Sequence, residues 1–404
     1  MSTGVDVDAR TGAGPRNLTV AHLLVLTIGT FTLGVDGYVL AGLIPEVAAD
    51  LHVSISTAGQ LTALFAVVYA VGSPVIAALT GSWDRRVLLA GGMVVFVAGL
   101  VVQAAGPNFA TVAAGRVVAA LGAAAYQANA FSTAGLLSDD AHRARSLAIV
   151  SGGGSLALVA GLPFGILLGQ AWGWRTAVWI LMVPAVIALC AVALLPAAHA
   201  PRLSLRDRLR VLTDARVRAI LLGTVTVIVP AFLLIAYLPA VLEVSGTLVV
   251  AAMLAFGGGQ VVGTTVVARL IRLRGAPSTL VLGASGMAAC AVLLAVGRTS
   301  TLGAVVAMTG LGVAVGIAIV PQQHRLFALV PAIAPIAMGL NGSAVYLAVA
   351  LGTGLGGGAL ALVGASALAP TAAVLGLLAV TVGLAVRPEG QESAGNTRGV
   401  RRAK

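Results

Sequence analysis

Twelve long apolar runs restrict this chain to one class of fold. They cover residues 19–45, 57–80, 87–106, 109–137, 146–170, 174–196, 215–242, 248–270, 277–297, 301–328, 334–363 and 367–386. A helix needs about 20 apolar residues to cross the hydrocarbon core of a bilayer. The chain is 59% hydrophobic and 9% charged, whereas a soluble domain is about 25% charged. We therefore expect an all-α integral membrane protein with twelve transmembrane helices.

The basic residues predict how these helices are oriented. If the N-terminus is cytoplasmic, both tails and the even-numbered connections hold 21 of the 24 Lys and Arg residues, while the other connections hold only Arg175 and Arg298. Cytoplasmic loops of membrane proteins carry such an excess. We expect a multi-pass protein of the cell (inner or plasma) membrane with both termini in the cytoplasm. This placement accounts for the net charge of +11, so nucleic-acid binding is not expected.

The longest polar connection divides the chain into two halves. We expect a disordered cytoplasmic tail at 1–18, a six-helix bundle at 19–196, a cytoplasmic linker at 197–214, a second six-helix bundle at 215–387 and a basic cytoplasmic tail at 388–404. The linker has the spacing of an amphipathic surface helix.

The two halves resemble each other. The glycine pattern at Gly161 returns at Gly352, 191 positions later, and Pro45 at the end of the first run returns as Pro239 after 194 positions. Repeats of six spans are typical of transporters, whose substrate site lies near the midplane between them. The alternative is a chance similarity between helices rich in Gly, Ala and Val.

Asp36 and Arg116 are the only charges in the middle of apolar runs. Asp36 lies nine residues before Pro45 and Arg116 seven residues after Phe109, which places them about 13 Å and about 10 Å below the same surface. A charge at this depth costs from about 2.5 to over 10 kcal/mol, and such residues are functional by default.

The two charges predict a mechanism for proton coupling. Burial favours the neutral form of an aspartate, and a nearby arginine favours the charged form. If Arg116 approaches Asp36 in one conformation and retreats in another, Asp36 binds a proton from one side and releases it to the other. The alternative is a fixed ion pair that only holds two spans together.

Three motifs carry a family resemblance. Span 5 has glycines and a proline at Gly152, Gly161, Pro163, Gly165 and Gly169, span 4 has Arg116 followed by Gly122, and span 1 has Gly34-Val-Asp36-Gly-Tyr38. Together they resemble motifs of the major facilitator superfamily, most closely its twelve-span drug:proton antiporter and arabinose-efflux-like branch. The resemblance implies the major facilitator fold, two pseudo-symmetric six-helix bundles, and antiport through the span 5 motif.

The loop between spans 2 and 3 departs from the family pattern. It keeps Arg85 and Arg86, which we include among the conformational motif residues, but Gly81 stands where the family has aspartate and Ser82 where it has arginine. In the family this loop is thought to hold the outward-open state, so the resemblance does not extend to that role. Asp84, one turn later, is a hypothetical substitute.

Several uncharged polar residues lie on spans that would line a central cavity. The candidates for substrate contact are Gln60, Tyr69, Gln127, Tyr237, Gln260, Asn341 and Tyr346. The alternative for each is a hydrogen bond between helices. Because the second half has no buried charge, we expect apolar and hydrogen-bonding contacts there, which suit a small amphipathic molecule, drug- or sugar-like.

Catalytic patterns are missing from the sequence. The five histidines are scattered without metal-binding spacing, and there is no phosphate-binding loop. We expect no enzyme activity, metal or cofactor, with a proton gradient as the energy source and the substrate, protons and lipid bilayer as partners of a monomer. The expected function is export in exchange for protons. Proton-coupled or facilitative uptake of a small nutrient, and a non-transporting membrane enzyme or sensor, remain alternatives.

Overall fold

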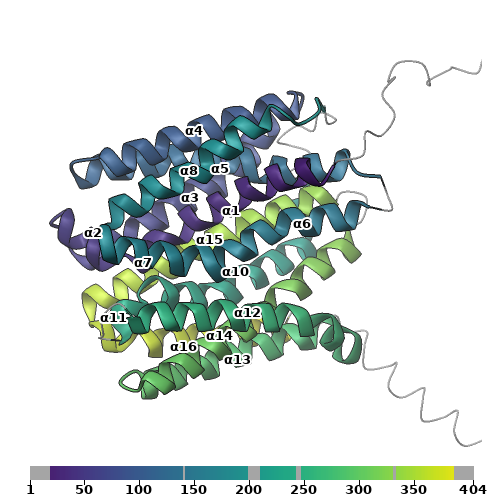
Figure 1. Ribbon diagram of the computed structural model, residues 1–404. Coiled ribbons are helices and arrows are strands. Elements are labelled where there is room, and N and C mark those ends of the chain that lie inside the picture. The colour runs from purple at the N-terminus through teal and green to yellow at the C-terminus, as the bar shows by residue number, and fades with distance from the viewer. Residues whose placement is uncertain (1–18, 140–141, 199–209, 243–246, 331–333, 386–404) are drawn as a thin grey trace, which may run out of the picture.

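The computed structural model describes residues 19–139, 142–198, 210–242, 247–330 and 334–385. Over these residues the chain forms long helices that lie side by side, and twelve are long and apolar enough to cross a membrane (Figure 1). The predicted all-α membrane fold with twelve spans is thus confirmed. The predicted tails at 1–18 and 388–404 and most of the linker at 197–214 lie outside the described residues.

The helices form two bundles. The first bundle contains α1 (Val20–Gly42), α2 (Ile44–Asp50), α3 (Ile55–Leu79), α4 (Arg85–Ala105), α5 (Phe109–Leu136), α6 (Arg143–Leu156), the π-helical turn η1 (Ala157–Gly161), α7 (Leu162–Trp172) and α8 (Trp174–Val192). The second contains η2 (Val211–Thr213), α10 (Ala215–Ala236), α11 (Leu238–Leu242), α12 (Thr247–Arg274), α13 (Ala276–Gly297), α14 (Thr301–Leu329), α15 (Ala334–Leu362), η4 (Ala365–Ala367) and α16 (Leu368–Ala385).

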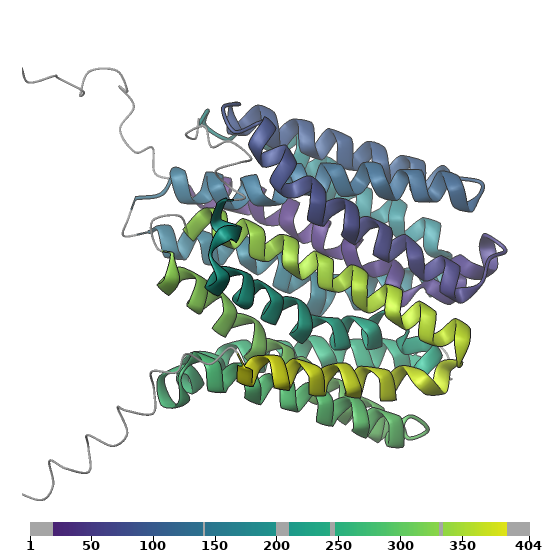
Figure 2. The ribbon, with the colours of Figure 1, turned by 180° about the vertical axis from the view of Figure 1, so that it is seen from behind.

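The bundles meet mainly along two sets of helices, with a smaller contact between α1 and α10. In the first set α3 packs on α15, and in the second α12 packs on η1 and α7. Figure 2 shows α15 running beside α3 at the boundary between the bundles. Buried side chains from both bundles form one continuous hydrophobic core. Any site between the bundles is therefore bounded by these two sets of helices.

Two spans end earlier than the apolar runs predict. The runs 19–45 and 215–242 each continue past a break, where α1 ends at Gly42 and α10 ends at Ala236. Pro45 lies in the first turn of α2 and Pro239 in the first turn of α11. Proline lacks an N–H group and is favoured in the first turn of a helix, which is where both prolines lie after the break. The same break recurs in both bundles.

Polar side chains set where the spans begin. Short connections supply N-cap residues whose side chains accept a hydrogen bond from the first turn, namely Thr19, Ser54, Asp84, Asn108, Asp214 and Ser300. Such caps satisfy backbone N–H groups that the helix itself leaves unpaired. The capped ends explain why the observed boundaries lie within a few residues of the apolar runs.

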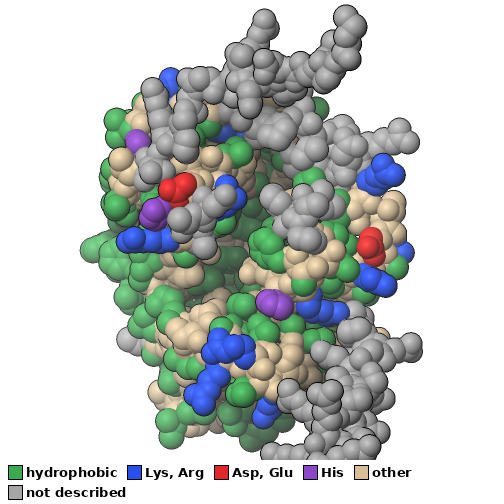
Figure 3. Space-filling view, turned by 90° about the vertical axis from the view of Figure 1, so that its right-hand side faces the viewer, with side chains coloured by type: hydrophobic (Ala, Val, Ile, Leu, Met, Phe, Trp, Pro, Cys, Tyr) green, Lys and Arg blue, Asp and Glu red, His purple; other side chains and the backbone are tan. Residues whose placement is uncertain are grey.

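The described arginines gather at one end of the helices. We call this end the basic face, and it carries Arg85, Arg86, Arg143, Arg145, Arg210, Arg216, Arg218, Arg269, Arg272, Arg274 and Arg325. Figure 3 views this end and shows its basic side chains. The opposite end, the far face, carries Arg175 and Arg298. The charge asymmetry that the sequence predicts is therefore present in the fold.

Candidate functional site

Asp36 on α1 and Arg116 on α5 form an ion pair inside the first bundle. Nη1 of Arg116 lies 3.1 Å from Oδ2 of Asp36 and donates a 3.0 Å hydrogen bond to the Asp36 carbonyl oxygen. Nε donates to the carbonyl oxygen of Leu61 on α3 at 3.3 Å. Both charged side chains are fully buried. One guanidinium group thus joins three helices, and the structure brings together the two charges that the sequence places at similar depth.

The ion pair does not use all of its hydrogen-bonding capacity. Oδ1 of Asp36 and Nη2 of Arg116 are buried and have no hydrogen-bond partner among the described residues, and the same holds for the Thr62 hydroxyl on α3. Buried polar groups normally find partners. Oδ1 is therefore an oxygen of the carboxylate at which a proton can add.

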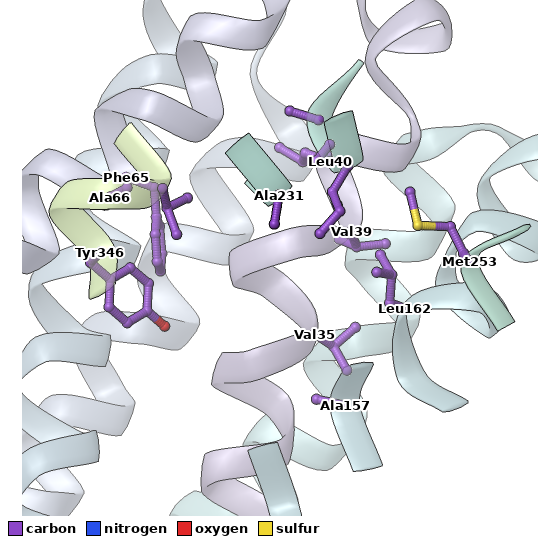
Figure 4. Packing of buried hydrophobic residues seen from close by; sticks show 14 of the residues in the cluster. Val35, Val39, Leu40, Phe65, Ala66, Ala157, Leu162, Ala231, Met253 and Tyr346 are labelled. Atoms are coloured by element: carbon purple, nitrogen blue, oxygen red, sulfur yellow. The ribbon is translucent and has the colours of Figure 1, made fainter. Parts of the chain in front are cut away.

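An aromatic cluster extends from Arg116 to the second bundle. The guanidinium carbon of Arg116 lies 4.3 Å from the centre of the Phe65 ring, a cation–π distance. Phe65 and Tyr69 lie one turn apart on α3, and Tyr346 of α15 stacks on Tyr69 with 3.7 Å between ring centres. Figure 4 shows Phe65 and Tyr346 side by side on their two helices. The charged site therefore contacts the other bundle through aromatic rings.

The glycine stripe of span 5 holds α1 in place. A methyl group at Gly161, Gly165 or Gly169 would overlap the side chains of Val35 and Val39 on α1 and of Leu43 just after it, in the same order. Small residues let two helices approach closely in a membrane. Figure 4 shows Val35 and Val39 directed toward this part of the chain. Since Asp36 follows Val35, the motif packs directly against the helix that carries the buried carboxylate.

The rest of the predicted span 5 motif lies beside this stripe. Pro163 is in the first turn of α7, which follows the π-helical turn η1. Gly152 is exposed on α6, with open space where a side chain would be. A π-helical turn inserts extra residues into a helix and is frequent at functional sites. Span 5 also packs tightly on α1 in its half nearer the basic face, where a methyl group at Gly153 would overlap Thr30 and the Thr30 hydroxyl donates to the Val150 carbonyl oxygen.

The two bundles are joined near the far face. The Ser56 hydroxyl donates a 2.9 Å hydrogen bond to the carbonyl oxygen of Gly357. The buried Tyr237 side chain fits against Gly59, where a methyl group would overlap its hydroxyl. Closer to the centre, Tyr38 and Phe232 pair across the boundary with 5.3 Å between ring centres. These contacts close the far face.

The basic face is hollowed between the bundles. Figure 3 shows a depression there with hydrophobic side chains deep inside it. Toward the far face the two halves are closed by the contacts of Ser56 and Tyr237. The structure is thus open at the basic face and closed at the far face.

The remaining predicted cavity residues divide into three groups. Gln127 and Gln260 are partly buried, and their Oε1 atoms have no partner among the described residues, so they can hydrogen-bond a ligand. Asn341 accepts a 2.8 Å hydrogen bond from Thr224 and thereby ties α15 to α10. Gln60 is exposed near the start of α3, apart from the aromatic cluster. Tyr69 and Tyr346 belong to the aromatic cluster, and Tyr237 makes one of the contacts that close the far face.

Arg85 and Arg86 anchor the first bundle at the basic face. Nη1 of Arg85 donates to Oδ1 of Asn129 on α5, and the buried Arg85 side chain also reaches the Gly81 carbonyl oxygen at 3.3 Å. Arg86 donates to the carbonyl oxygen of Ala193. Asp84 caps the first turn of α4 through the Arg86 N–H group. Asp84 as a substitute for the missing family aspartate stays a hypothesis.

Two residues of interest were missed by sequence reasoning. Phe65 gave no signal because one aromatic residue in an apolar run is ordinary. Glu46 lies just beyond the first span, and burial raises the pKa of its carboxyl, with a backbone hydrogen bond opposing the shift. Its Oε2 atom is buried without a partner among the described residues. Its position one residue after Pro45 is the only sequence signal that it had.

Comparisons with known proteins agree with this architecture. The family model of the Major Facilitator Superfamily matches residues 26–353. A chloramphenicol resistance protein of Streptomyces lividans is 35% identical over 271 residues, which cover 65% of this chain and 69% of that protein. An uncharacterized MFS-type transporter of Bacillus subtilis (strain 168), YbcL, is 26% identical over 83% of this chain and 87% of its own length.

A solved structure shows the same fold. A crystal structure of a mutant of the nucleoside transporter NupG superposes with a TM-score of 0.74, covering 91% of this chain and 100% of that one. The sequences are 12% identical, so this likeness concerns the fold alone. It confirms the predicted architecture of two six-helix bundles.

Proposed function

Because the chain belongs to the major facilitator superfamily, we propose that this multi-pass membrane transporter exports a small amphipathic molecule in exchange for protons by alternating access. The observation that carries the proposal is the fully buried ion pair of Asp36 and Arg116, which leaves one carboxylate oxygen unpartnered among the described residues. Ionisable groups inside a membrane mark ion and proton pathways. The span 5 motif, which resembles that of antiporters, packs on the same helix.

The charges support an orientation in the cell membrane. Cytoplasmic ends of spans carry an excess of arginine and lysine, so the basic face and both termini lie in the cytoplasm. The hollow then opens to the cytoplasm while Ser56 and Tyr237 close the outer side. This is the inward-facing state, in which an exporter takes up its substrate.

The ion pair supplies the coupling to protons. In the inward-facing state Arg116 contacts Oδ2 of Asp36 and stabilises the carboxylate form, which burial opposes. When the bundles move and Arg116 withdraws, burial acts alone and Asp36 binds a proton from outside. The return of Arg116 releases that proton into the cytoplasm. A membrane potential contributes about 2.3 kcal/mol per charge per 100 mV, which supports a gradient of about fifty-fold.

The walls of the site favour an amphipathic substrate. Among the described residues of the second bundle, no charged side chain is fully buried. Aromatic rings and the amides of Gln127 and Gln260 are available instead. A relative that is named for chloramphenicol resistance supports export of a drug-like compound. We further propose that the protein acts as a monomer, without metal or cofactor, and catalyses no chemical reaction.

A host that expresses the protein tests this function. Susceptibility is screened with amphipathic antibiotics that include chloramphenicol, and each compound to which the host becomes resistant is added to proteoliposomes that contain a pH-sensitive dye. We expect proton flow opposite to the compound. Proton flow in the same direction would indicate uptake, and a wild-type protein that moves neither would contradict transport.

Asp36→Asn is the decisive variant in both assays. We expect a folded protein that confers no resistance and moves no protons when the compound is added. Asp50→Asn is the matched control, because Asp50 is paired with Arg175 at 2.8 Å on the far face, away from the buried site. Unchanged proton-driven transport by Asp36→Asn would exclude Asp36 as the proton carrier.

A further inference from the structure

Tyr346 is the side chain that connects the second bundle to the surroundings of the ion pair. A Cβ atom at Gly37, next to Asp36, would lie 3.7 Å from the Tyr346 hydroxyl. The centres of the Tyr346 and Phe65 rings lie 6.3 Å apart, and Phe65 also contacts the Arg116 guanidinium. Tyr346 thus lies beside the helix that carries the carboxylate and beside the ring over which Arg116 is placed.

The direct contacts of the two charges are made within the first bundle. Arg116 donates to Asp36 and to the Leu61 carbonyl oxygen, which belong to α1 and α3. A change in the charge of Asp36 therefore moves groups of the first bundle first. To affect the position of the second bundle, this change has to be transmitted through a contact across the boundary. Phe65, whose ring lies under the guanidinium, makes such a contact with Tyr346.

We propose that Tyr346 is a positioning residue that couples the charge state of Asp36 to the movement of the second bundle. This rests on the proposed proton exchange. While Asp36 is charged, Arg116 stays over Phe65, and Phe65 supports the stack of Tyr346 on Tyr69 that holds α15 against α3. The empty, deprotonated protein is then held in its inward-facing state.

Coupled exchange needs this restraint. An exchanger that changes conformation with Asp36 protonated, and also when empty and deprotonated, carries protons across the membrane without moving substrate. Loss of the Tyr346 contact permits the empty, deprotonated protein to change conformation, because the bundles then separate regardless of the charge of Asp36. The expected result is a proton leak that needs no substrate. Aromatic pairs contribute about 0.5–1.5 kcal/mol, so the leak should rise about two- to tenfold.

The test uses full-length protein in proteoliposomes with an imposed pH gradient, a pH-sensitive dye and no substrate. Tyr346→Leu and Phe65→Leu are each expected to leak protons, and the double variant should leak no more than either, since both break one chain of contacts. Tyr346→Phe keeps the ring contacts with Phe65 and Tyr69 and removes only the hydroxyl, so it should leak fewer protons than Tyr346→Leu. Phe256→Leu, which removes a buried ring elsewhere in the second bundle, is the control.

The outcomes separate the two proposals. A leak by Tyr346→Leu that disappears when Asp36→Asn is added supports the coupling role. A leak no greater than that of Phe256→Leu overturns it, as does a leak by Tyr346→Phe equal to that of Tyr346→Leu. If Tyr346→Leu does not fold, Phe65→Leu carries the test. Failure of the wild-type protein to exchange compound for protons overturns the proposed function itself.

Discussion

Gly59→Ala should open the far side of the protein. The new methyl carbon would lie 2.8 Å from Cζ and 3.0 Å from Cε1 of Tyr237, and closer still to the hydroxyl. Carbon atoms normally approach to about 3.5–4.0 Å, so the ring has to move by about 1 Å. Tyr237 is 1% exposed and fits between the bundles, where Gly357 leaves only 2.7 Å for a similar methyl group. The ring therefore has no free space on the α15 side.

The size of the effect follows from the cost of overpacking. Adding a methyl group to a filled core costs about 1–3 kcal/mol, and here the cost falls only on the state in which the far face is closed. A shift of this size changes the ratio of the two states about 5- to 150-fold. Gly91→Ala is the matched control, because a methyl group at Gly91 meets nothing within 4 Å.

Labelling of a single cysteine measures this shift. Ser56→Cys is introduced after replacement of Cys190 and Cys290 by alanine, and the purified protein in lipid nanodiscs is treated with a maleimide. The half-buried position 56 reacts when the far side opens, so the labelling rate follows the open population. We expect Gly59→Ala to raise the rate about 5- to 150-fold. A labelling rate equal to or below that of the parent would refute the conclusion that Tyr237, packed against Gly59, closes the far face.

Two further substitutions test the buried charge and the half-buried acid. Arg116→Lys should lower export of the resisted compound by at least about tenfold. An ammonium group cannot hydrogen-bond to Asp36 and to the Leu61 carbonyl oxygen at once, and each charged hydrogen bond contributes about 1.5–3 kcal/mol. A near-normal susceptibility profile would show that charge alone suffices. Glu46→Gln should raise the thermal unfolding midpoint at pH 7.5, with a gain that vanishes near pH 4. Burial raises the pKa of the Glu46 carboxyl, so the protonated side chain stabilises the folded protein below the ordinary pKa. That stability is lost as the pH rises through the raised pKa, and at pH 7.5 the uncharged glutamine avoids the loss. An equal gain at both pH values would contradict this.

The positions of the spans were predictable because three independent signals coincide at their ends. Apolar runs stop where a capping side chain such as Ser54 or Asn108 begins the next helix, and arginines mark one face. The breaks before Pro45 and Pro239 were not predicted, because proline also occurs within continuous spans, as Pro74 and Pro230 do. An apolar residue count does not register a break, because the residues on both sides of it are apolar.

The candidate site was predictable only in part. Rise per residue places Asp36 and Arg116 at similar depth, yet it does not say which helices are neighbours, so their contact had to come from the fold. The pairing of Tyr346 with Phe65 and Tyr69 joins helices from different bundles and depends on how α3 and α15 align. Helix periodicity carries no information on that alignment.

The location of the ion pair within one bundle bears on how fast the transporter can turn over. Parting opposite charges in a medium of low polarity costs several kcal/mol, and every 1.36 kcal/mol added to an activation barrier slows a step about tenfold. The hydrogen bond from Ser56 to Gly357, which helps to close the far face, is uncharged, while Asp36 and Arg116 both belong to the first bundle. Rotation of one bundle against the other therefore breaks a neutral hydrogen bond and ring contacts, and the cost of parting Arg116 from Asp36 falls on a separate rearrangement within the first bundle.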